Sequence, residues 1–465
     1  MIAPDVVQGP LLLLGGLMVA VIAFSSVELT LYLLIFSTLL SPELMLGGGA
    51  PSGAADHAVT TTASRGITLR LDDMLLTVIC LTWLFRMAVY KELGLVRQTP
   101  INRPITWYWL VALAATIAGF YAGRVGAFGF FFVIKYLEYF VLFYMIINQI
   151  NDLDSIKRYL HVMLLTCFIA SVLGIAQIPS GLRVSAPFEG AEGEPNTFGG
   201  YLVLMFSVAL GMFLYARSNK AKLLLGILIL SILVPLAFTE SRSSYLSFAM
   251  AVFLFILFAE NKRLIIFVCL VGLTVAPFVL PKNVVDRVMY TFTQAEEHGQ
   301  INVGGLRIDT STSERLHAWQ DVLSKSFPVH PLLGVGVTGG RFMDAQYPRV
   351  LAETGIIGLA CFLWFLRRIW VLLREDYRRL RDPVLKGVAL GTLCGYGGLL
   401  VHAIGANTFI IVRIMEPLMI LLGLLLASRL VQQSDSEDVE DANQDRDQEL
   451  AEQSEHSGLQ SQPSV

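Results

Sequence analysis

Apolar segments recur along almost the whole chain, and this pattern limits the fold more than any other feature. Each segment can anchor a helix of the ~20 mostly apolar residues that cross a bilayer. They centre on Leu11–Phe24, Leu29–Leu40, Met74–Tyr90, Ile105–Tyr121, Ala127–Ile147, Tyr159–Gln177, Phe198–Tyr215, Leu223–Phe238, Tyr245–Ala259, Leu264–Leu280, Val350–Leu366, Val388–Ile404 and Thr408–Leu426. The first two are short and share a turn without positive charge, so the sequence predicts an all-α, polytopic membrane bundle of 12 or 13 helices.

Composition supports a membrane domain followed by a polar tail. Hydrophobic residues make up 55% of the chain and charged residues 15%, which is not the balance of a soluble domain. Ten acidic residues and one arginine fall between Asp435 and Glu455, where apolar residues are almost absent. Such a stretch cannot bury enough surface to fold. We expect residues 1–430 to form the membrane domain and residues 431–465 to form a disordered, acidic cytoplasmic tail.

Clusters of lysine and arginine predict the orientation, because cytoplasmic connections carry an excess of both. Five clusters fall on alternate connections: Arg86–Arg103, Lys157-Arg158, Arg217–Lys222, Lys262-Arg263 and Arg367–Lys386. The opposite face then holds the Arg183–Pro195 loop, the Glu240–Arg242 corner and the long polar stretch Pro281–Pro348. In a bacterium this face is the periplasm. We therefore expect a multi-pass inner-membrane protein whose chemistry gathers at one large external loop, residues 281–348.

Three arginines on the predicted external face are candidate diphosphate ligands: Arg183, Arg242 and Arg315. Arginine keeps its charge and binds phosphate oxygens through two parallel N–H groups. Three arginines on one face therefore suit a diphosphate at the membrane surface. Taken singly, each is also consistent with an anchor at the lipid interface or with a loop ion pair.

The residues around Arg315 predict a short amphipathic helix in the external loop. Ser311-x-x-Glu314 matches a capping box, so the helix should begin near Thr312. An apolar stripe that can lie on the bilayer follows at near-helical spacing. Its members are Leu316, Trp319, Leu323 and Phe327. Arg315 falls in the first turn, where free N–H groups and the helix dipole also favour an anion.

Two carboxylates at the next helix start, Asp344 and Glu353, are candidate bases. Either can accept a proton from a hydroxyl group, although Asp344 is equally consistent with a helix cap. His402 lies at the external end of its span and is better explained by a polar contact than by catalysis. His317 and His330 have no third residue at metal-ligand spacing, so we expect no metal site.

Several short motifs follow one another between Arg183 and Leu366. They are Pro195-Asn196-Thr197-Phe198, Thr239-x-Ser241-Arg242, Glu314-Arg315-x-x-x-Trp319, Pro331-Leu332-Leu333-Gly334-Val335-Gly336 and Tyr347…Leu351-x-Glu353-x-Gly355-Ile356-Ile357-Gly358-Leu359. In their order and predicted topology they resemble the O-antigen ligase and Wzy-type polymerase superfamily of bacterial integral-membrane glycosyltransferases.

The resemblance implies a metal-independent, cofactor-free transfer from a polyprenyl-diphosphate-linked glycan donor to a glycan or glycolipid acceptor. Arg183, Arg242 and Arg315 match the family's arginine positions and would stabilise the diphosphate leaving group. Membrane lipids are the other expected partners, and nucleic acid is not one.

One departure concerns the base. The family commonly has His-Asn where this chain has Asp344-Ala345. Asp344 can replace the histidine, and the change favours a polysaccharide polymerase or another glycan ligase over ligation to the lipid A core. Two alternatives stay open: a lipid-linked glycan flippase, which needs a central cavity open to alternate sides, and a catalytically inactive homologue.

Overall fold

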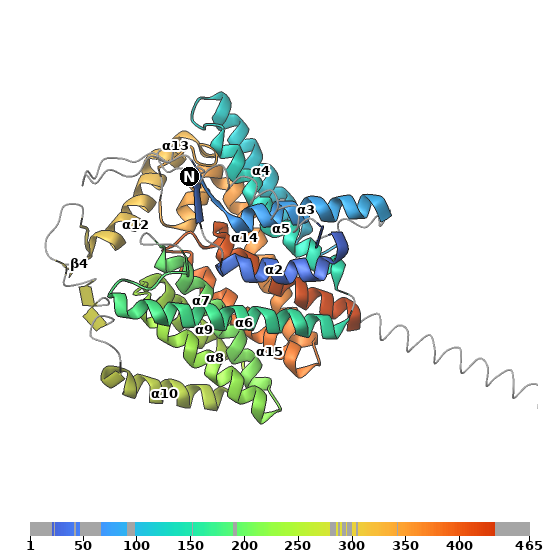
Figure 1. Cartoon of the computed structure of the whole chain (residues 1–465). Coiled ribbons are helices and arrows are strands. Elements are labelled where there is room, and N and C mark those ends of the chain that lie inside the picture. The colour runs from blue at the N-terminus through green and yellow to red at the C-terminus, as the bar shows by residue number, and fades with distance from the viewer. Residues whose placement is uncertain are drawn as a thin grey trace, which may run out of the picture.

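The computed structural model of the chain is a bundle of long helices (Figure 1). It describes residues 21–22, 24–40, 43–46, 67–90, 98–150, 152–188, 193–279, 285–286, 289–290, 294, 300–303, 306–341 and 343–432. Most of the predicted span Leu11–Phe24 lies outside these residues, as does much of the 281–348 loop. The predicted tail lies outside them from residue 433 onward.

The helices follow the predicted apolar segments closely. In chain order they are α2 (Val27–Leu40), α3 (Leu71–Tyr90), α4 (Asn102–Tyr121), α5 (Phe128–Gln149), α6 (Leu153–Gln177), α7 (Pro195–Tyr215), α8 (Asn219–Phe238), α9 (Arg242–Phe258), α10 (Lys262–Val279), α14 (Gln346–Arg379), α15 (Pro383–His402) and a final helix, Val412–Gln432. The final helix ends two residues beyond the predicted boundary at residue 430.

The all-α, polytopic membrane fold is confirmed. Within the described ranges, eight helices are long and apolar enough to cross a membrane, and α2 and α9 are shorter apolar helices. The total of 12 or 13 spans stays a prediction. Two short antiparallel ribbons were not predicted. One pairs β1 (Glu43–Leu46) with β2 (Ile67–Arg70), and the other pairs β3 (Asn302–Val303) with β4 (Leu306–Arg307).

The described part of the external loop contains the predicted short helical elements. They are α12 (Thr310–Asp321), the π-turn η4 (Val322–Ser326) and α13 (Phe327–Val329). Val322 is buried with Leu351 and Ala352 of α14, and the partly buried Phe327 packs against the same cluster. The loop helices are therefore fixed to the start of α14 by apolar contact.

Small residues bring α7 and α15 close together at the centre of the bundle. A Cβ on Gly387 would lie 2.7 Å from the carbonyl oxygen of Gly211, and one on Gly391 would lie 2.4 Å from that of Ser207. Inside a membrane, apolar side chains gain little by leaving lipid tails for another helix. Helices therefore associate mainly through close backbone packing at small residues. These two helices therefore form a tight centre onto which the others pack.

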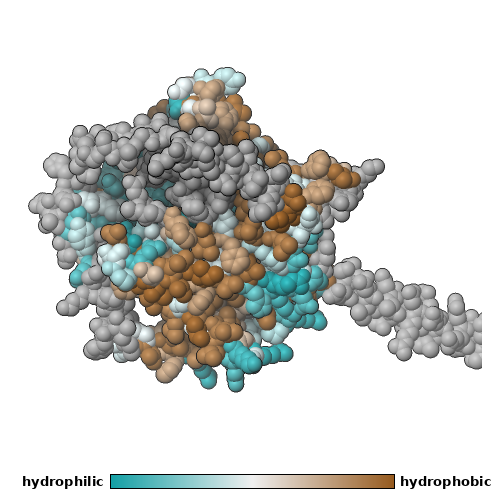
Figure 2. Space-filling model, in the orientation of Figure 1, coloured by the Kyte–Doolittle hydropathy of each residue, from teal (hydrophilic) through white to brown (hydrophobic). Residues whose placement is uncertain are grey.

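Other helices present apolar side chains outward. On α8, Leu223, Leu224 and Leu230 are each about two-thirds exposed. Figure 2 shows hydrophobic side chains across the face on which α6 and α8 lie in Figure 1. In water such a continuous apolar surface would be unfavourable, whereas lipid tails cover it without cost.

A break in α14 joins two of the sequence motifs. Gly355 has φ 66° and ψ −166°, so the helical hydrogen bonds are interrupted there. The freed carbonyls of Ala352 and Glu353 accept hydrogen bonds from the N–H groups of Val335 and Gly336, both at 2.9 Å. In return, the N–H of Ile356 donates to the Pro331 carbonyl at 2.9 Å. The loop segment Pro331–Gly336 thus completes the backbone hydrogen bonding of the broken helix.

Replacing Gly355 with alanine should markedly lower the thermal unfolding temperature of the protein. The backbone conformation at Gly355 is almost restricted to glycine and costs another residue about 1–3 kcal/mol. A Cβ there would also lie 2.3 Å from the Leu332 carbonyl oxygen. The measurement is thermal unfolding of the detergent-purified protein. Gly226→Ala is the control, since a Cβ at Gly226 meets no atom closer than 4.0 Å. Equal unfolding temperatures for the two variants would contradict the prediction.

Candidate active site

Several helix ends meet at one end of the bundle. The N–H of Gln346, at the start of α14, donates to the carbonyl of Ala403 after α15 at 3.0 Å. Ser243 Oγ, in the first turn of α9, donates to the Gly405 carbonyl at 3.2 Å. Ser241 Oγ, the N-cap of α9, donates to Asn196 Oδ1 in the first turn of α7 at 2.7 Å. Residues from four distant helices are therefore neighbours, and Arg242, Arg315 and Asp344 lie around them.

Arg242 forms an ion pair that the sequence did not predict. Its Nη2 lies 2.6 Å from Asp309 Oδ2, and the two side chains are only 17% and 2% exposed. Asp309 is the N-cap residue of α12, which begins at Thr310. The predicted capping box at Ser311 was therefore wrong, and the helix begins two residues before the predicted start. Asp309 thus ties α12 to the start of α9.

Arg315 has a different environment. It is half-buried and makes no hydrogen bond or ion pair with the described residues, and its Nε is buried without a partner. Its electrostatic interactions with other charged residues are, largest first, with Asp344, Arg242, Asp309 and Glu314. Burial is the main influence and lowers the pKa of the guanidinium from its ordinary value. A buried cation without a direct counter-ion is costly and favours an anionic ligand.

Gly405 lies next to this arginine and leaves room for Ser243. A Cβ on Gly405 would lie 3.6 Å from Arg315 Nε and 2.6 Å from Ser243 Oγ. The guanidinium of Arg315 therefore lies against the turn that follows α15. Of the predicted apolar stripe around it, Leu316 and Leu323 are 40% and 52% exposed. These two exposed side chains are suited to contact with lipid, whereas Phe327 of the same stripe packs against the Val322 cluster.

Arg183 lies at the same end of the bundle but binds backbone. Its Nε donates to the Thr239 carbonyl at 3.0 Å, and its Nη2 donates to the Glu240 carbonyl at 3.1 Å. Glu240 has a positive φ of 48°, which is uncommon for a residue other than glycine. Arg183 therefore stabilises the strained turn that immediately precedes Arg242.

Asp344 is exposed and lies next to the arginine pair rather than at a helix cap. The N-cap of α14 is Ala345. Asn407 Nδ2 donates to the Met343 carbonyl at 2.9 Å and lies 3.4 Å from Asp344 Oδ1. Asp344 is also the largest charged influence on Arg315. The structure therefore brings Asp344, Arg315 and Arg242 into one group of charges.

Glu353 belongs to a separate buried pair. Its Oε1 lies 3.0 Å from Arg349 Nε, one helical turn away, and both side chains are 10% exposed. The same oxygen accepts the N–H of Thr338 at 3.2 Å, and Thr338 has a positive φ of 65°. Glu353 thus holds the loop after Gly336 in place. Its charge is not among those that act on Arg315.

His402 makes the polar contacts that the sequence favoured over catalysis. It is fully buried, with Nδ1 2.8 Å from Thr408 Oγ1 and Nε2 3.3 Å from Ser244 Oγ. Ser244 Oγ donates in turn to Ser241 Oγ at 2.8 Å. The histidine therefore links the turn after α15 to the first turn of α9.

Sequence reasoning missed Asp309, Arg349 and Asn407. Asp309 had a usable signal, because an aspartate before a Ser/Thr-rich helix start is a common N-cap. The others show no local pattern that marks a long-range contact. Buried oxygens of Asp309 and Asn407 (Oδ1 in each) have no hydrogen-bond partner in the described part of the chain. Such atoms mark places where a ligand or water completes the hydrogen bonding.

Replacing Asp309 with asparagine should lower the free energy of unfolding near neutral pH and weaken its dependence on acid pH. Burial acts to raise the pKa of this carboxyl, but the hydrogen bond from Arg242, helped by the nearby polar groups of Thr312, outweighs it and leaves the pKa below its ordinary value of 3.8. A carboxyl group whose pKa is lower in the folded protein stabilises the fold fully above its unfolded pKa of 3.8. This stabilisation is lost as the pH falls through the lower pKa of the folded state.

Because a charge-assisted hydrogen bond is lost, we expect the free energy of unfolding to decrease by about 1.5–3 kcal/mol near neutral pH. Thermal unfolding between pH 3 and 7 measures it. Asp321→Asn, which removes a largely exposed i,i+4 pair with Lys325, is the control and should change stability little. A decrease no larger for Asp309→Asn than for this control would mean that the Arg242 ion pair is unimportant.

Comparison with known families supports the resemblance seen in the motifs. Residues 233–363 match the sequence model of a family described as O-antigen ligase. This range contains Arg242, Arg315, Asp344 and Glu353, whereas Arg183 precedes it. A search of curated proteins finds no match to the chain. The resemblance of this multi-pass membrane protein to the O-antigen ligase and Wzy-type superfamily is thereby confirmed over residues 233–363.

Proposed function

We propose that the chain transfers a glycan from a polyprenyl-diphosphate donor to a hydroxyl group of a glycan or glycolipid acceptor, without a metal ion. The family domain supports glycan ligation or polymerisation in general. The observation that carries the finer proposal is Arg315. It is a half-buried cation without a direct ion pair, placed beside Arg242 and Asp344. This arrangement suits a diphosphate that brings its own negative charge.

The reaction replaces a glycosyl phosphate bond with a glycosidic bond. The acceptor oxygen attacks the anomeric carbon of the donor sugar, and the bond from that carbon to the diphosphate oxygen breaks. The bonding electrons leave with the polyprenyl diphosphate, whose negative charge grows in the transition state. Arg315 and Arg242 stabilise this charge, and a fixed electrostatic contact of this kind lowers the barrier more than it strengthens ground-state binding. The proton of the acceptor hydroxyl passes to a carboxylate, for which Asp344 is the nearer candidate.

Asp309 and Arg183 have supporting roles in this proposal. Asp309 holds Arg242 in one orientation through a 2.6 Å contact. Arg183 binds the carbonyls of Thr239 and Glu240 and so fixes the turn that carries Arg242. Arg183 therefore contributes by positioning Arg242.

The distribution of basic residues supports an external, periplasmic site. Clusters such as Arg217–Lys222 and Lys262-Arg263 lie at the ends of α7–α10 that are far from Arg242. Because cytoplasmic connections are enriched in lysine and arginine, the Arg242 end faces the periplasm. The same orientation places the C-terminal tail in the cytoplasm. Without the family's histidine, a polysaccharide polymerase or a glycan ligase other than a lipid A-core ligase is the activity that we favour.

The proposal is tested with purified protein in liposomes that contain a polyprenyl-diphosphate-linked glycan and an acceptor. We expect a joined glycan and free polyprenyl diphosphate in equal amounts, with the rate unchanged by EDTA. A second molecule of the lipid-linked glycan as the better acceptor indicates polymerisation, and a glycolipid indicates ligation. Movement of the donor between leaflets without bond cleavage would instead identify a flippase. Neither cleavage nor movement would identify an inactive homologue.

A further inference from the structure

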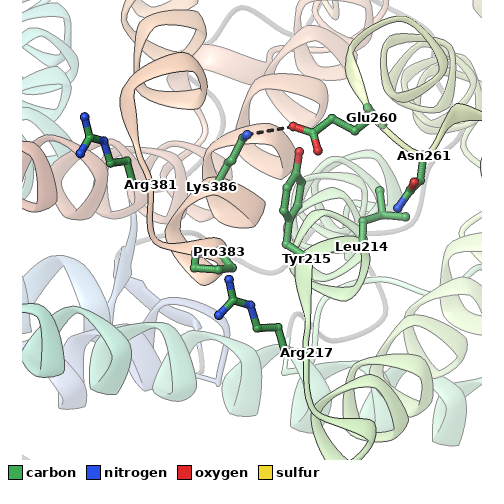
Figure 3. A pocket seen from close by; sticks show the side chains of 9 residues that line it. Leu214, Tyr215, Arg217, Glu260, Asn261, Arg381, Pro383 and Lys386 are labelled. Atoms are coloured by element: carbon green, nitrogen blue, oxygen red, sulfur yellow. Dashed lines mark hydrogen bonds and ion pairs between the residues drawn. The ribbon is translucent and has the colours of Figure 1, made fainter.

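A polar pocket lies at the end of the bundle opposite to the candidate active site. Figure 3 shows the side chains that line it. The end of α7, the α9–α10 turn and the α14–α15 turn surround it, with a volume of about 340 Å³. The other ends of α7, α9 and α15 reach Asn196, Arg242 and His402. A helix of 20 residues is ~30 Å long, so the bundle separates the two sites by about the thickness of a bilayer core. The volume lies in the range of small-molecule sites.

The pocket is lined by three cations and one carboxylate, and one cation is already neutralised. Lys386 Nζ lies 2.8 Å from Glu260 Oε1 and points toward it in Figure 3. The hydrogen bond from Lys386 is the main cause that lowers the pKa of Glu260, so this carboxylate stays ionised near neutral pH. Lys386 is also held over the rings of Tyr215 and Tyr377, 5.5 and 5.7 Å from their centroids.

The other two cations, Arg217 and Arg381, have no such partner. Both are exposed, and neither makes a hydrogen bond or ion pair with the residues that the structure describes. They come from different turns: in Figure 3 the guanidinium of Arg217 lies beside Pro383 at the start of α15, whereas the side chain of Arg381 points away from it. The pocket therefore carries two uncompensated positive charges beside a fixed Lys386–Glu260 pair. Ordinary basic anchors of a cytoplasmic face, such as Lys220 and Lys222, do not line this pocket.

We propose that this pocket binds a phosphate-bearing anion, as the headgroup of an anionic phospholipid or as a soluble phosphate ester. Guanidinium groups match phosphate oxygens through two parallel N–H donors, and Arg217 and Arg381 supply two such groups to this pocket from separate turns. Basic pockets between helix ends on the cytoplasmic side are suited to anionic headgroups, because that leaflet is negatively charged. The site is independent of the proposed glycan transfer.

The test compares ligands by the thermal stability of the full-length, detergent-purified protein. Phosphatidylglycerol, phosphatidylcholine and glycerol phosphate are titrated separately. We expect stabilisation by phosphatidylglycerol and not by phosphatidylcholine. In Arg217→Gln/Arg381→Gln, the phosphatidylglycerol concentration needed for half the effect should rise roughly 10- to 30-fold, since each basic residue near an anionic surface contributes about a factor of five. Stabilisation by glycerol phosphate that depends on the same two arginines would identify a soluble anion as the ligand.

A matched double variant separates a defined pocket from a generally basic face. Lys220→Gln/Lys222→Gln removes the same charge from the exposed start of α8 and should bind like the wild type. Arg217→Lys/Arg381→Lys keeps both positive charges and should recover phosphatidylglycerol binding in part. This variant also tests the proposal if the glutamine variant does not fold. Equal losses in the two glutamine variants, or no stabilisation by either phosphate-bearing ligand, would overturn the proposal.

Discussion

Replacing Arg315 with alanine is expected to lower glycan transfer by about 10²–10³-fold while the protein still inserts and folds. The removal of one fixed electrostatic contact to a developing oxyanion costs roughly 3–4 kcal/mol of transition-state stabilisation in comparable sites. Arg315 makes no ion pair or hydrogen bond with the described residues, so its loss leaves no described partner unpaired. The effect on catalysis should therefore be large and the effect on folding small.

The measurement is the rate of polyprenyl diphosphate release, normalised to folded protein. Arg315→Lys should recover only part of the rate, because an ammonium cannot form the two-pronged contact with a phosphate. Lys325→Ala is the control on the same external segment. Its side chain is 74% exposed and pairs with Asp321 at 2.6 Å, so its loss should leave transfer unchanged. Wild-type rates in a folded Arg315→Ala protein would refute the assignment of Arg315 to the leaving group.

The membrane bundle could be predicted from the sequence because each span carries its own signal. Hydrocarbon offers no hydrogen bonds, so a spanning segment must satisfy its backbone as a helix and must be apolar over that length. The predicted segment Leu223–Phe238 thus became α8, Asn219–Phe238, with only its polar first turn missed. The break at Gly355 was not predicted, although its residues were noticed as motifs. Its cause is hydrogen bonding to Pro331–Gly336, a contact between segments that periodicity does not record.

The candidate site could be predicted only in part, for the same reason. Arg242 and Arg315 were identified by residue type and predicted face, and the structure places them in one group of charges. The 2.6 Å contact between Arg242 and Asp309 bridges 67 residues of sequence, and no local pattern indicates it. Arg183 was identified as a diphosphate ligand, yet its guanidinium binds two carbonyls. A residue type predicts what a side chain can bind, but only the fold determines which groups reach it.

The identity of the base can be determined by comparing two isosteric variants. Asp344→Asn keeps the size of the side chain and removes the proton acceptor. If Asp344 is the general base, transfer should fall by roughly 10²–10⁴-fold. Asp344 is exposed and is not the N-cap of α14, so its substitution should change folding little. The pH dependence gives a second measure: a carboxylate base must be ionised, so the wild-type rate falls toward low pH, and Asp344→Asn should lose this dependence.

Glu353→Gln is expected to act on the fold as well as on any chemistry. Its partner Arg349 is only 10% exposed, and a buried charge that loses its counter-ion costs about 3–5 kcal/mol. Low amounts of folded protein with a near-normal rate per folded molecule would therefore show a structural role. Glu314→Gln controls for a change in charge next to Arg315, since Glu314 is exposed and acts on Arg315 only through its field. If Asp344→Asn retains transfer while folded Glu353→Gln loses it, Glu353 is the base. If both variants retain transfer, neither carboxylate accepts the proton, and the acceptor hydroxyl is activated by another group.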